Sequence, residues 1–213
     1  MDAAPGSSQA LRARIVLLAG PSGSGKTHLA AVSGLPVLEL DDFYRSGDDP
    51  ELPRDAALGI VDWDDPRSWD ASSAMAAIEE ICRAGSAEVP IYDIARDGRV
   101  GSRRFDVDGH SAFAGTGIFA AEMVAGCSER GLLADAIVVR RARWKNFLRR
   151  LRRDLTEHRK PPITIIRRGI GLFRAESAIV ARQVALGCRP CDRMQTVDAL
   201  SSHAKGTPVT PTD

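Results

Sequence analysis

One stretch of sequence decides the fold: Gly20-Pro21-Ser22-Gly23-Ser24-Gly25-Lys26-Thr27. It fits the P-loop pattern G-x-x-x-x-G-K-[ST] at every fixed position. Residues 13–19 before it are mostly apolar and predict a buried parallel strand, and residues 26–33 predict a helix. In that setting the glycines let successive backbone N–H groups face one phosphate chain at the positive end of the helix. We therefore expect a nucleoside triphosphate site; the alternative is a glycine-rich turn without a ligand.

Two side chains of this loop carry the charge and the metal chemistry. Lys26 supplies a positive charge for the β- and γ-phosphates, and the Thr27 hydroxyl is suited to Mg²⁺. The expected cofactors are therefore ATP and Mg²⁺. The predicted nucleotide-binding residues here are Gly20, Ser22, Gly23, Ser24, Gly25, Lys26, Thr27 and His28.

Length and composition place few limits on function. The 213 residues suit one domain, or one domain with a lid, and the shares of hydrophobic (44%) and charged (27%) residues are ordinary. A net charge of +1 gives no overall attraction to nucleic acid or membrane, and no apolar run approaches the ~20 residues that span a bilayer. Because residues 1–8 lack the layout of a signal peptide, we expect a cytoplasmic protein. Its expected parts are a disordered leader (1–10), one P-loop domain (11–200) and a disordered tail (201–213).

The four cysteines, Cys82, Cys127, Cys188 and Cys191, do not have the spacing of a disulfide framework. The last two form a lone C-x-x-C. Zinc would require a second ligand pair nearby, and a redox motif would follow a thioredoxin-like strand. We expect ordinary reduced thiols.

The rest of the chain alternates between strand-like and helix-like segments. Residues 103–108 are expected to be a hairpin arm that turns at Asp108-Gly109. Strands alternating with helices behind a P-loop predict an α/β fold, a doubly wound parallel sheet with helices on both faces. The other predicted strands are 35–40, 88–95, 112–114 and 134–139, and the predicted helices are 71–84, one through Val124, and 163–186.

Two acidic residues, Asp41 and Asp42, follow the predicted strand 35–40. A parallel sheet places its chemistry just beyond the carboxyl ends of its strands, so this pair is expected to face the nucleotide. The same residues could instead cap a turn or the next helix, and the sequence leaves both interpretations open. Residues 46–70 lack periodicity, which is typical of a functional loop.

The segment 140–160 is strongly basic, since ten of its twenty-one residues are Lys or Arg. Apolar residues recur in it at helical spacing, which predicts a helix with one apolar stripe. Three interpretations exist: a solvated face, a nucleic-acid surface, or a lid that supplies arginines to a phosphoryl group in transfer. The P-loop favours a basic helical lid over about residues 141–160.

Taken together, these segments resemble the uridine kinase family of P-loop kinases, from about Ile15 to about Lys160. Apart from the P-loop, four segments carry the resemblance. Asp41-Asp42-Phe43-Tyr44-Arg45 is similar to D-x-F-Y-R, and residues 63–70 are similar to F-D-H-P-x-x-F-D. Pro90-Ile91-Tyr92-Asp93, followed by Arg99, resembles the P-x-Y-D segment, and residues 149–157 resemble the lid signature R-R-x-x-R-D-x-x-E.

The resemblance implies a role for each matched residue. Asp41 would accept the proton of the attacking hydroxyl and, with Thr27, hold Mg²⁺. The catalytic set is then Asp41, Lys26, Arg150 and Arg153, with the two arginines closing over the phosphates and Arg149 added to the nucleotide-binding set. The residues implied to bind the acceptor are Asp64, Tyr92, Arg99 and Tyr44.

Four departures from the family pattern bear on this expectation. The family's E-G-I element is Thr116-Gly117-Ile118 here, so a hydroxyl replaces a carboxylate, and Glu122 is an uncertain substitute. Asp97 stands at the position of a family His, and His158 at that of a lid arginine. The chain beyond Pro162 does not follow the family, so uridine specificity is not supported.

The sequence therefore predicts a kinase domain of the uridine kinase type. It would transfer the γ-phosphoryl of ATP to a hydroxyl of a nucleoside or related metabolite. Its expected partners are a small-molecule acceptor and, as in many uridine kinases, further copies of itself in a homo-oligomer. The alternative is a nucleotide-binding regulatory P-loop protein with weak or no kinase activity, which Thr116 supports. A third candidate, an ATPase that acts on nucleic acid, is opposed by the near-neutral net charge.

Overall fold

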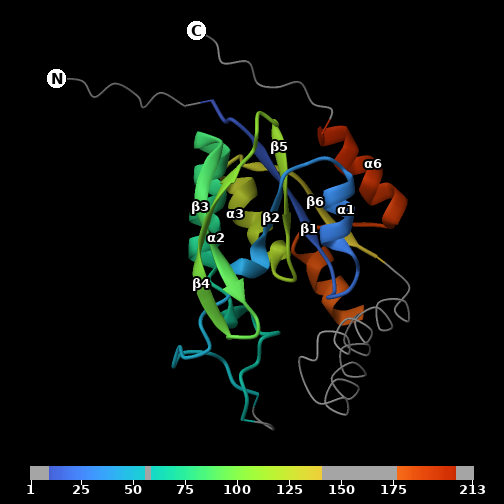
Figure 1. Ribbon diagram of the computed structural model, residues 1–213. Helices are drawn as coiled ribbons and strands as arrows, with labels where there is room; N and C mark the ends of the chain where they lie inside the picture. The colour runs from blue at the N-terminus through green and yellow to red at the C-terminus, as the bar shows by residue number, and fades with distance from the viewer. Residues whose placement is uncertain (1–9, 56–58, 141–176, 205–213) are drawn as a thin grey trace, which may run out of the picture.

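The computed structural model describes residues 10–55, 59–140 and 177–204. They form a five-stranded sheet in the order β2-β5-β1-β6-β7, in which every pair of neighbouring strands is parallel (Figure 1). The predicted α/β fold with a parallel sheet is confirmed. The strands are β1 (Arg14–Ala19), β2 (Val37–Glu39), β5 (Ala112–Thr116), β6 (Leu133–Val139) and β7 (Arg189–Cys191).

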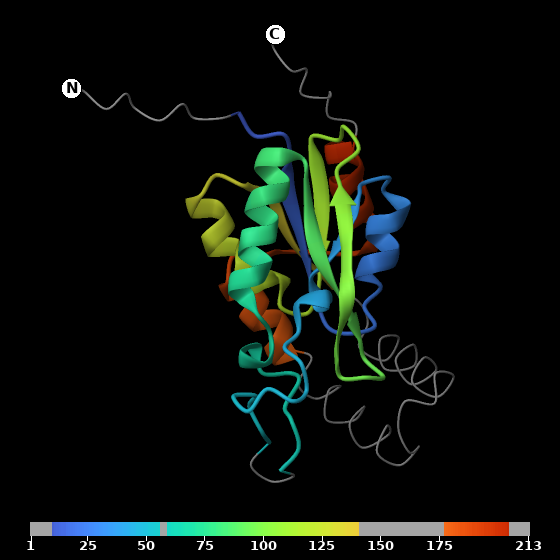
Figure 2. The ribbon, with the colours of Figure 1, turned by 60° about the vertical axis from the view of Figure 1, so that its left-hand side comes forward.

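Helices cover both faces of the sheet, as predicted (Figure 2). Helices α1 (Lys26–Val32) and α6 (Arg193–Ala204) lie on one face. Helices α2 (Ala71–Ala84) and α3 (Val124–Glu129) lie on the other.

The central strand β1 is buried on both faces. Val16 and Leu18 pack into a core with Leu29 of α1 and Leu200 of α6. Ile15 and Leu17 belong to the core on the opposite face, which includes buried residues of α2 and α3. Because successive side chains of a strand point to opposite faces, a strand between two helical layers must be apolar throughout. This explains the uninterrupted apolar run before the P-loop.

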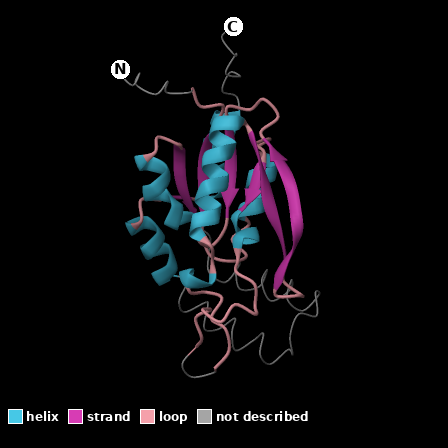
Figure 3. Ribbon diagram, turned by 90° about the vertical axis from the view of Figure 1, so that its left-hand side faces the viewer, coloured by secondary structure: helices cyan, strands magenta, loops and turns pink. Residues whose placement is uncertain are grey.

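A two-stranded antiparallel ribbon, β3 (Ser86–Asp93) and β4 (Gly98–Asp106), stands beside α2 (Figure 3). The predicted hairpin was therefore wrong in its partner and its turn. The arm around residues 103–106 pairs with β3, and the hairpin turn lies at residues 94–97. Asp108-Gly109 instead leads into β5, which joins the parallel sheet. A strand pattern predicts that a segment will pair, but it does not identify the partner.

Other boundaries also differ from those predicted. The segment after β5 is a 3₁₀ helix, η3 (Ala120–Met123), before α3 begins, and residues 201–204 belong to α6 rather than to a disordered tail. Of the predicted helix 163–186, residues 177–185 are described and helical. The leader 1–9, the predicted lid 141–160 and residues 205–213 lie outside the described residues.

All four cysteines are free and buried. Burial raises the pKa of Cys82 to about 12 and those of Cys127 and Cys188 to about 11. Within the described part of the chain, no helix is both long and apolar enough to cross a membrane.

Helix α2 begins at the side chain of Asp70. Its Oδ1 accepts hydrogen bonds from the backbone N–H of Ser73 (3.0 Å) and the hydroxyl of Ser72 (2.8 Å). Its Oδ2 accepts from the hydroxyl of Ser73 (2.6 Å) and from Arg99 Nη2 (3.2 Å). Burial alone would raise the pKa of Asp70, but these donors hold it well below its ordinary value. Ser72 and Ser73, in the first turn of the helix, thus both hold the capping carboxylate of Asp70.

We predict that Asp70→Ala lowers the free energy of unfolding by about 1–2 kcal/mol at neutral pH, because the helix loses its cap. A carboxyl whose pKa is lowered by folding stabilises the protein above its unfolded pKa, and loses that effect as the pH falls through its folded pKa. The difference between Asp70→Ala and the wild type should therefore shrink in acid, below the ordinary pKa of 3.8. Urea denaturation at pH 7 and pH 3 measures this. Glu80→Ala, on the exposed face of the same helix, should have little effect at either pH. A difference that does not change with pH would contradict the cap.

Candidate functional site

The P-loop closes at the carboxyl edge of the sheet through Gly20. A side chain there would place its Cβ 3.1 Å from Ser24 Oγ and 3.3 Å from the carbonyl oxygen of Val139 at the end of β6. Gly25 caps α1 with a φ of 91°, in the left-handed region that glycine adopts without steric cost. Gly20 is favoured because the loop turns close to Ser24 and the end of β6, and Gly25 is favoured because of its left-handed backbone.

Lys26 is folded inward over this loop. Its Nζ donates to the carbonyl oxygens of Gly20 (2.8 Å) and Pro21 (3.3 Å), and the residue is 8% exposed. Ser24 is 1% exposed, and its Oγ has no hydrogen-bond partner among the described residues. A buried ammonium beside an unpartnered hydroxyl fits the phosphate chain of a nucleotide. Thr27 and His28 are exposed on the first turn of α1, and Ser22 is half-buried in the loop.

Strand register brings the second predicted motif to the same edge. Leu18 of β1 is level with Thr116 of β5, and Thr116 is level with Glu39 of β2. The residues that follow these strands, among them Asp41 and Gly117, therefore meet at the edge where the P-loop begins. This is the lower end of the sheet in Figure 1.

The carboxylates of Asp41 and Asp42 bind to two different parts of the structure. Asp41 lies in η1 (Leu40–Phe43), and its Oδ1 accepts a hydrogen bond from the backbone N–H of Ile118 (3.2 Å). Asp42 turns toward the ribbon, where it accepts from the backbone N–H of Tyr92 (3.2 Å) and pairs with Arg103 (3.5 Å). Neither carboxylate caps η1. Asp41 therefore faces the loop after β5, and Asp42 anchors the ribbon.

Thr27 and Asp41 are the residues that could hold Mg²⁺. No group of three or more His, Cys, Asp or Glu suited to a metal ion occurs in the part of the chain that the structure describes. Mg²⁺ commonly keeps several waters and takes one or two carboxylates together with substrate phosphates, so this donor set fits an ion that arrives with a nucleotide.

Thr116 stands where the uridine kinase pattern has a glutamate, and two other carboxylates, Glu122 and Glu39, lie in the elements around it. Glu122 pairs with Arg182 at 2.7 Å, so it is directed to the helix 177–185. Glu39, which the sequence analysis did not single out, lies level with Thr116. Partial burial, and then the charge of Asp42, raise the pKa of Glu39. Its place at the end of a strand, two residues before Asp41, was the signal that could have found it.

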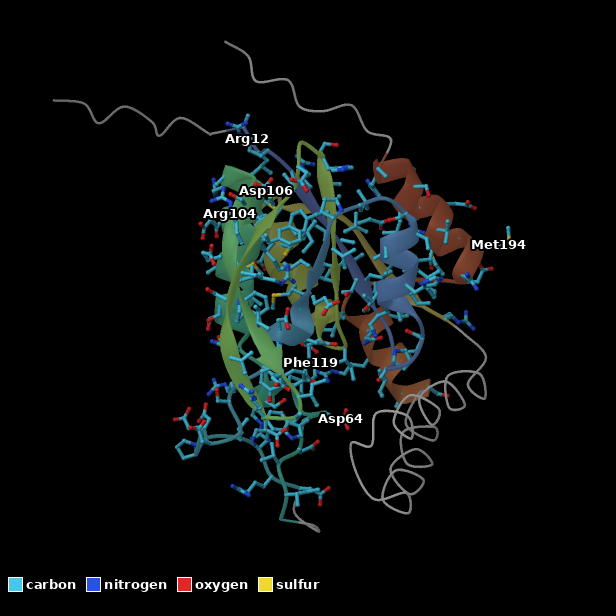
Figure 4. The ribbon with its side chains drawn as sticks, in the orientation of Figure 1. Arg12, Asp64, Arg104, Asp106, Phe119 and Met194 are labelled. Atoms are coloured by element: carbon cyan, nitrogen blue, oxygen red, sulfur yellow. The ribbon has the colours of Figure 1, made fainter. Side chains whose placement is uncertain are left out.

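Aromatic side chains gather below this edge. The Tyr44 ring lies 5.7 Å from those of Trp63 and Tyr92 and 5.9 Å from that of Phe119, between ring centres. The Tyr44 hydroxyl donates to the carbonyl oxygen of Trp63 (3.0 Å), and Asp64, next in sequence, is exposed. Figure 4 shows Asp64 and Phe119 at this end of the molecule. The structure thus brings Tyr44, Tyr92 and the loop of Asp64 together, and it adds Trp63 and Phe119, which the site prediction had not included.

The hydroxyl of Tyr92 is buried and has no hydrogen-bond partner among the described residues. Burial, with a smaller contribution from the negative charge of Asp97, raises the pKa of Tyr92 to about 12. The hydroxyl therefore stays protonated at neutral pH and can donate to a ligand.

Arg99 is bonded to groups of the protein itself. Its guanidinium donates to the carbonyl oxygens of Tyr44 (3.3 Å) and Phe43 (3.5 Å) and to Asp70 (3.2 Å). These bonds tie β4 to η1 and to the start of α2. A contact of Arg99 with substrate stays a prediction. The predicted lid residues Arg149, Arg150 and Arg153 lie outside the described residues.

The sequence of the chain was compared with those of known proteins. No protein-family model matches the chain. A segment of 100 residues is 34% identical to Inorganic pyrophosphatase TTM2 of Arabidopsis thaliana, covering 44% of this chain and 13% of that protein. A segment of 96 residues is 31% identical to Uridine kinase of Schizosaccharomyces pombe, covering 42% of this chain and 21% of that protein. The match thus spans about a fifth or less of either curated relative.

The fold itself has a solved counterpart. A candidate fructose transport system kinase from Silicibacter sp. TM1040 superposes with a TM-score of 0.58 at 18% identity, over 85% of this chain and 88% of that one. The likeness shows that the chain has the fold of a P-loop kinase. The expected resemblance to P-loop kinases is thereby confirmed in the fold, and 96 residues of the chain are similar to the uridine kinase of Schizosaccharomyces pombe.

We predict that Lys26→Ala weakens ATP binding about 10- to 100-fold, because a hydrogen bond to a charged group contributes roughly 1.5–3 kcal/mol. Isothermal titration with ATP and Mg²⁺ measures the dissociation constant. Arg83→Ala removes the same charge from the far side of α2, where Arg83 pairs with Glu79, and should bind ATP as the wild type does. An unchanged affinity in Lys26→Ala would mean that the loop is not a nucleotide site.

Proposed function

We propose that this chain is an ATP-binding small-molecule kinase of the uridine kinase type. It transfers the γ-phosphoryl group of ATP to a hydroxyl of a nucleoside or a related metabolite. The observation that carries the proposal is the position of Asp41, a carboxylate held by the Ile118 backbone at the sheet edge where the P-loop begins.

Each part of this edge has a task in the proposed reaction. The Lys26 ammonium and the backbone N–H groups of the loop hold the β- and γ-phosphates. Asp41 accepts the proton of the acceptor hydroxyl while the hydroxyl oxygen forms a bond to the γ-phosphorus. The bond from that phosphorus to the β–γ bridging oxygen breaks, and ADP leaves. Thr27 and Asp41 would hold Mg²⁺, which would supply positive charge to the phosphates.

The acceptor is proposed to lie in the aromatic cluster of Tyr44, Trp63, Tyr92 and Phe119. Ring faces and edges suit a flat or partly apolar ligand, and a few polar groups then fix its orientation. The unpartnered hydroxyl of Tyr92 and the exposed carboxylate of Asp64 are such groups. Asp97, at the turn of the ribbon, adds negative charge near Tyr92, which favours a neutral or cationic acceptor over a phosphorylated one.

A second candidate, a regulatory nucleotide-binding protein, rests on Thr116. The residue is 3% exposed and level with Glu39, and Glu122 is paired with Arg182. A weakly held metal would slow phosphoryl transfer while leaving the P-loop able to bind ATP.

The kinase proposal is tested by supplying ATP and Mg²⁺ with a panel of nucleosides and other small hydroxyl compounds, and by measuring ADP and phosphorylated product together. We predict that Asp41→Asn abolishes product formation, at least a hundredfold loss, and retains the ATP affinity measured without Mg²⁺, because proton acceptance and metal charge are lost while the phosphate loop is intact. Asp42→Asn keeps an oxygen for the Tyr92 N–H and should retain turnover within a few-fold. Turnover by Asp41→Asn at the wild-type rate would contradict the role of Asp41.

Thr116→Glu distinguishes the two candidates. If the missing carboxylate limits metal binding, the change should raise turnover at subsaturating Mg²⁺ by about tenfold, equivalent to ~1.4 kcal/mol of added metal affinity. Thr116→Gln adds the same bulk without the charge and should give no gain. Equal turnover in Thr116→Glu and the wild type would show that the metal site is built from other groups.

A further inference from the structure

We propose that Gln183 is a positioning residue for Asp41. It lies in the helix 177–185, far in sequence from the P-loop and from η1. The inference rests on the proposed function, in which Asp41 accepts a proton and holds Mg²⁺.

Two hydrogen bonds join Gln183 to the carboxylate through one residue. The side-chain Nε2 of Gln183 donates to the carbonyl oxygen of Ile118 at 2.9 Å. The backbone N–H of Ile118 donates to Asp41 Oδ1 at 3.2 Å. Both backbone polar groups of Ile118 are therefore engaged, one by the helix and one by the carboxylate. Gln183 thus fixes the orientation of the residue whose N–H holds Asp41.

The loop at Gly117 leaves little room on the other side. A Cβ on Gly117 would lie 2.8 Å from Asp41 Oδ1 and 3.1 Å from Leu40 Cβ. The loop therefore already lies against Asp41, and the displacement that would break the bond from Ile118 to Asp41 is movement away. The bond from Gln183 to Ile118 opposes that movement from within the protein, because Gln183 is 4% exposed. The neighbouring Arg182 pairs with Glu122 of η3 at a more exposed position, and its bond does not involve Ile118.

Stability alone does not explain a glutamine at this position. Its Oε1 is buried and has no hydrogen-bond partner among the described residues. Burying an amide with one half unpaired costs free energy, whereas an apolar side chain of the same length would not incur this cost. The residue is therefore better explained by what its Nε2 holds in place than by a contribution to folding.

The test compares Gln183→Met, which keeps length and removes the donor, with Arg182→Gln on the same helix. In Gln183→Met we expect kcat to fall about tenfold, since small misplacements of a catalytic group are costly. The thermal melting temperature should stay close to the wild-type value, and any rise in the KM for ATP should be smaller than the fall in kcat. Arg182→Gln should retain kcat within twofold. Wild-type kcat in Gln183→Met, or a kcat loss matched by a loss of folded protein, would overturn the inference.

A second measurement does not depend on finding the acceptor. ATP binding is titrated with and without Mg²⁺, and the gain in affinity from Mg²⁺ should shrink in Gln183→Met and persist in Arg182→Gln. If the wild type makes no phosphorylated product from any acceptor, the kinase proposal fails while this titration still decides the role of Gln183. An equal Mg²⁺ gain in Gln183→Met and the wild type, or no Mg²⁺ gain in the wild type, would overturn the inference.

Discussion

The architecture depends on the burial of β1 between two helical layers. Its alternate side chains enter two separate cores, so any shift of one residue would exchange the two faces and leave mismatched packing on each. Register is thereby fixed, and with it the point at which β1 ends. Gly20 then turns close to Val139 and Ser24, with a φ of 145° at which a side chain would be strained. The position of the phosphate loop is a consequence of how the centre of the sheet packs.

The same register determines where the rest of the site can be. Because β2, β5 and β1 are level at Glu39, Thr116 and Leu18, the segments after them meet without any long-range adjustment. The loop after β5 then lies against Asp41 closely enough that Gly117 has no space for a side chain. Asp42, the neighbouring residue, serves the ribbon instead. Because Asp41 and Asp42 point in different directions, η1 carries both a candidate catalytic carboxylate and an anchor for the ribbon.

The sequence predicted the parts of this structure that local chemistry determines. The P-loop, the apolar run of β1 and helix α2 carry their signals within a few residues, and the structure has them where they were expected. The hairpin failed because its pattern did not reveal that residues 103–106 pair with β3 rather than with the strand that follows. Asp41 could be chosen as a candidate from its position after a strand, but its separation from Asp42 depends on Ile118 and Arg103, which are distant in sequence. Gln183 and Phe119 carried no local signal, since they reach the site only through tertiary packing.

The buried polar atoms without partners give a physical reason to place function at this edge. Among the described residues these atoms are Ser24 Oγ, Arg45 Nε, Tyr92 Oη and Gln183 Oε1. They come from the P-loop, the segment after η1, the end of β3 and the helix 177–185, all of which converge near Asp41 and the aromatic cluster. Most buried polar groups in native proteins find partners, because leaving one unpaired costs free energy. Several such atoms at one end of the sheet, outside the two apolar cores, are groups that a bound ligand could pair. A nucleotide and an acceptor with hydrogen-bonding groups of their own are the ligands that such atoms would suit.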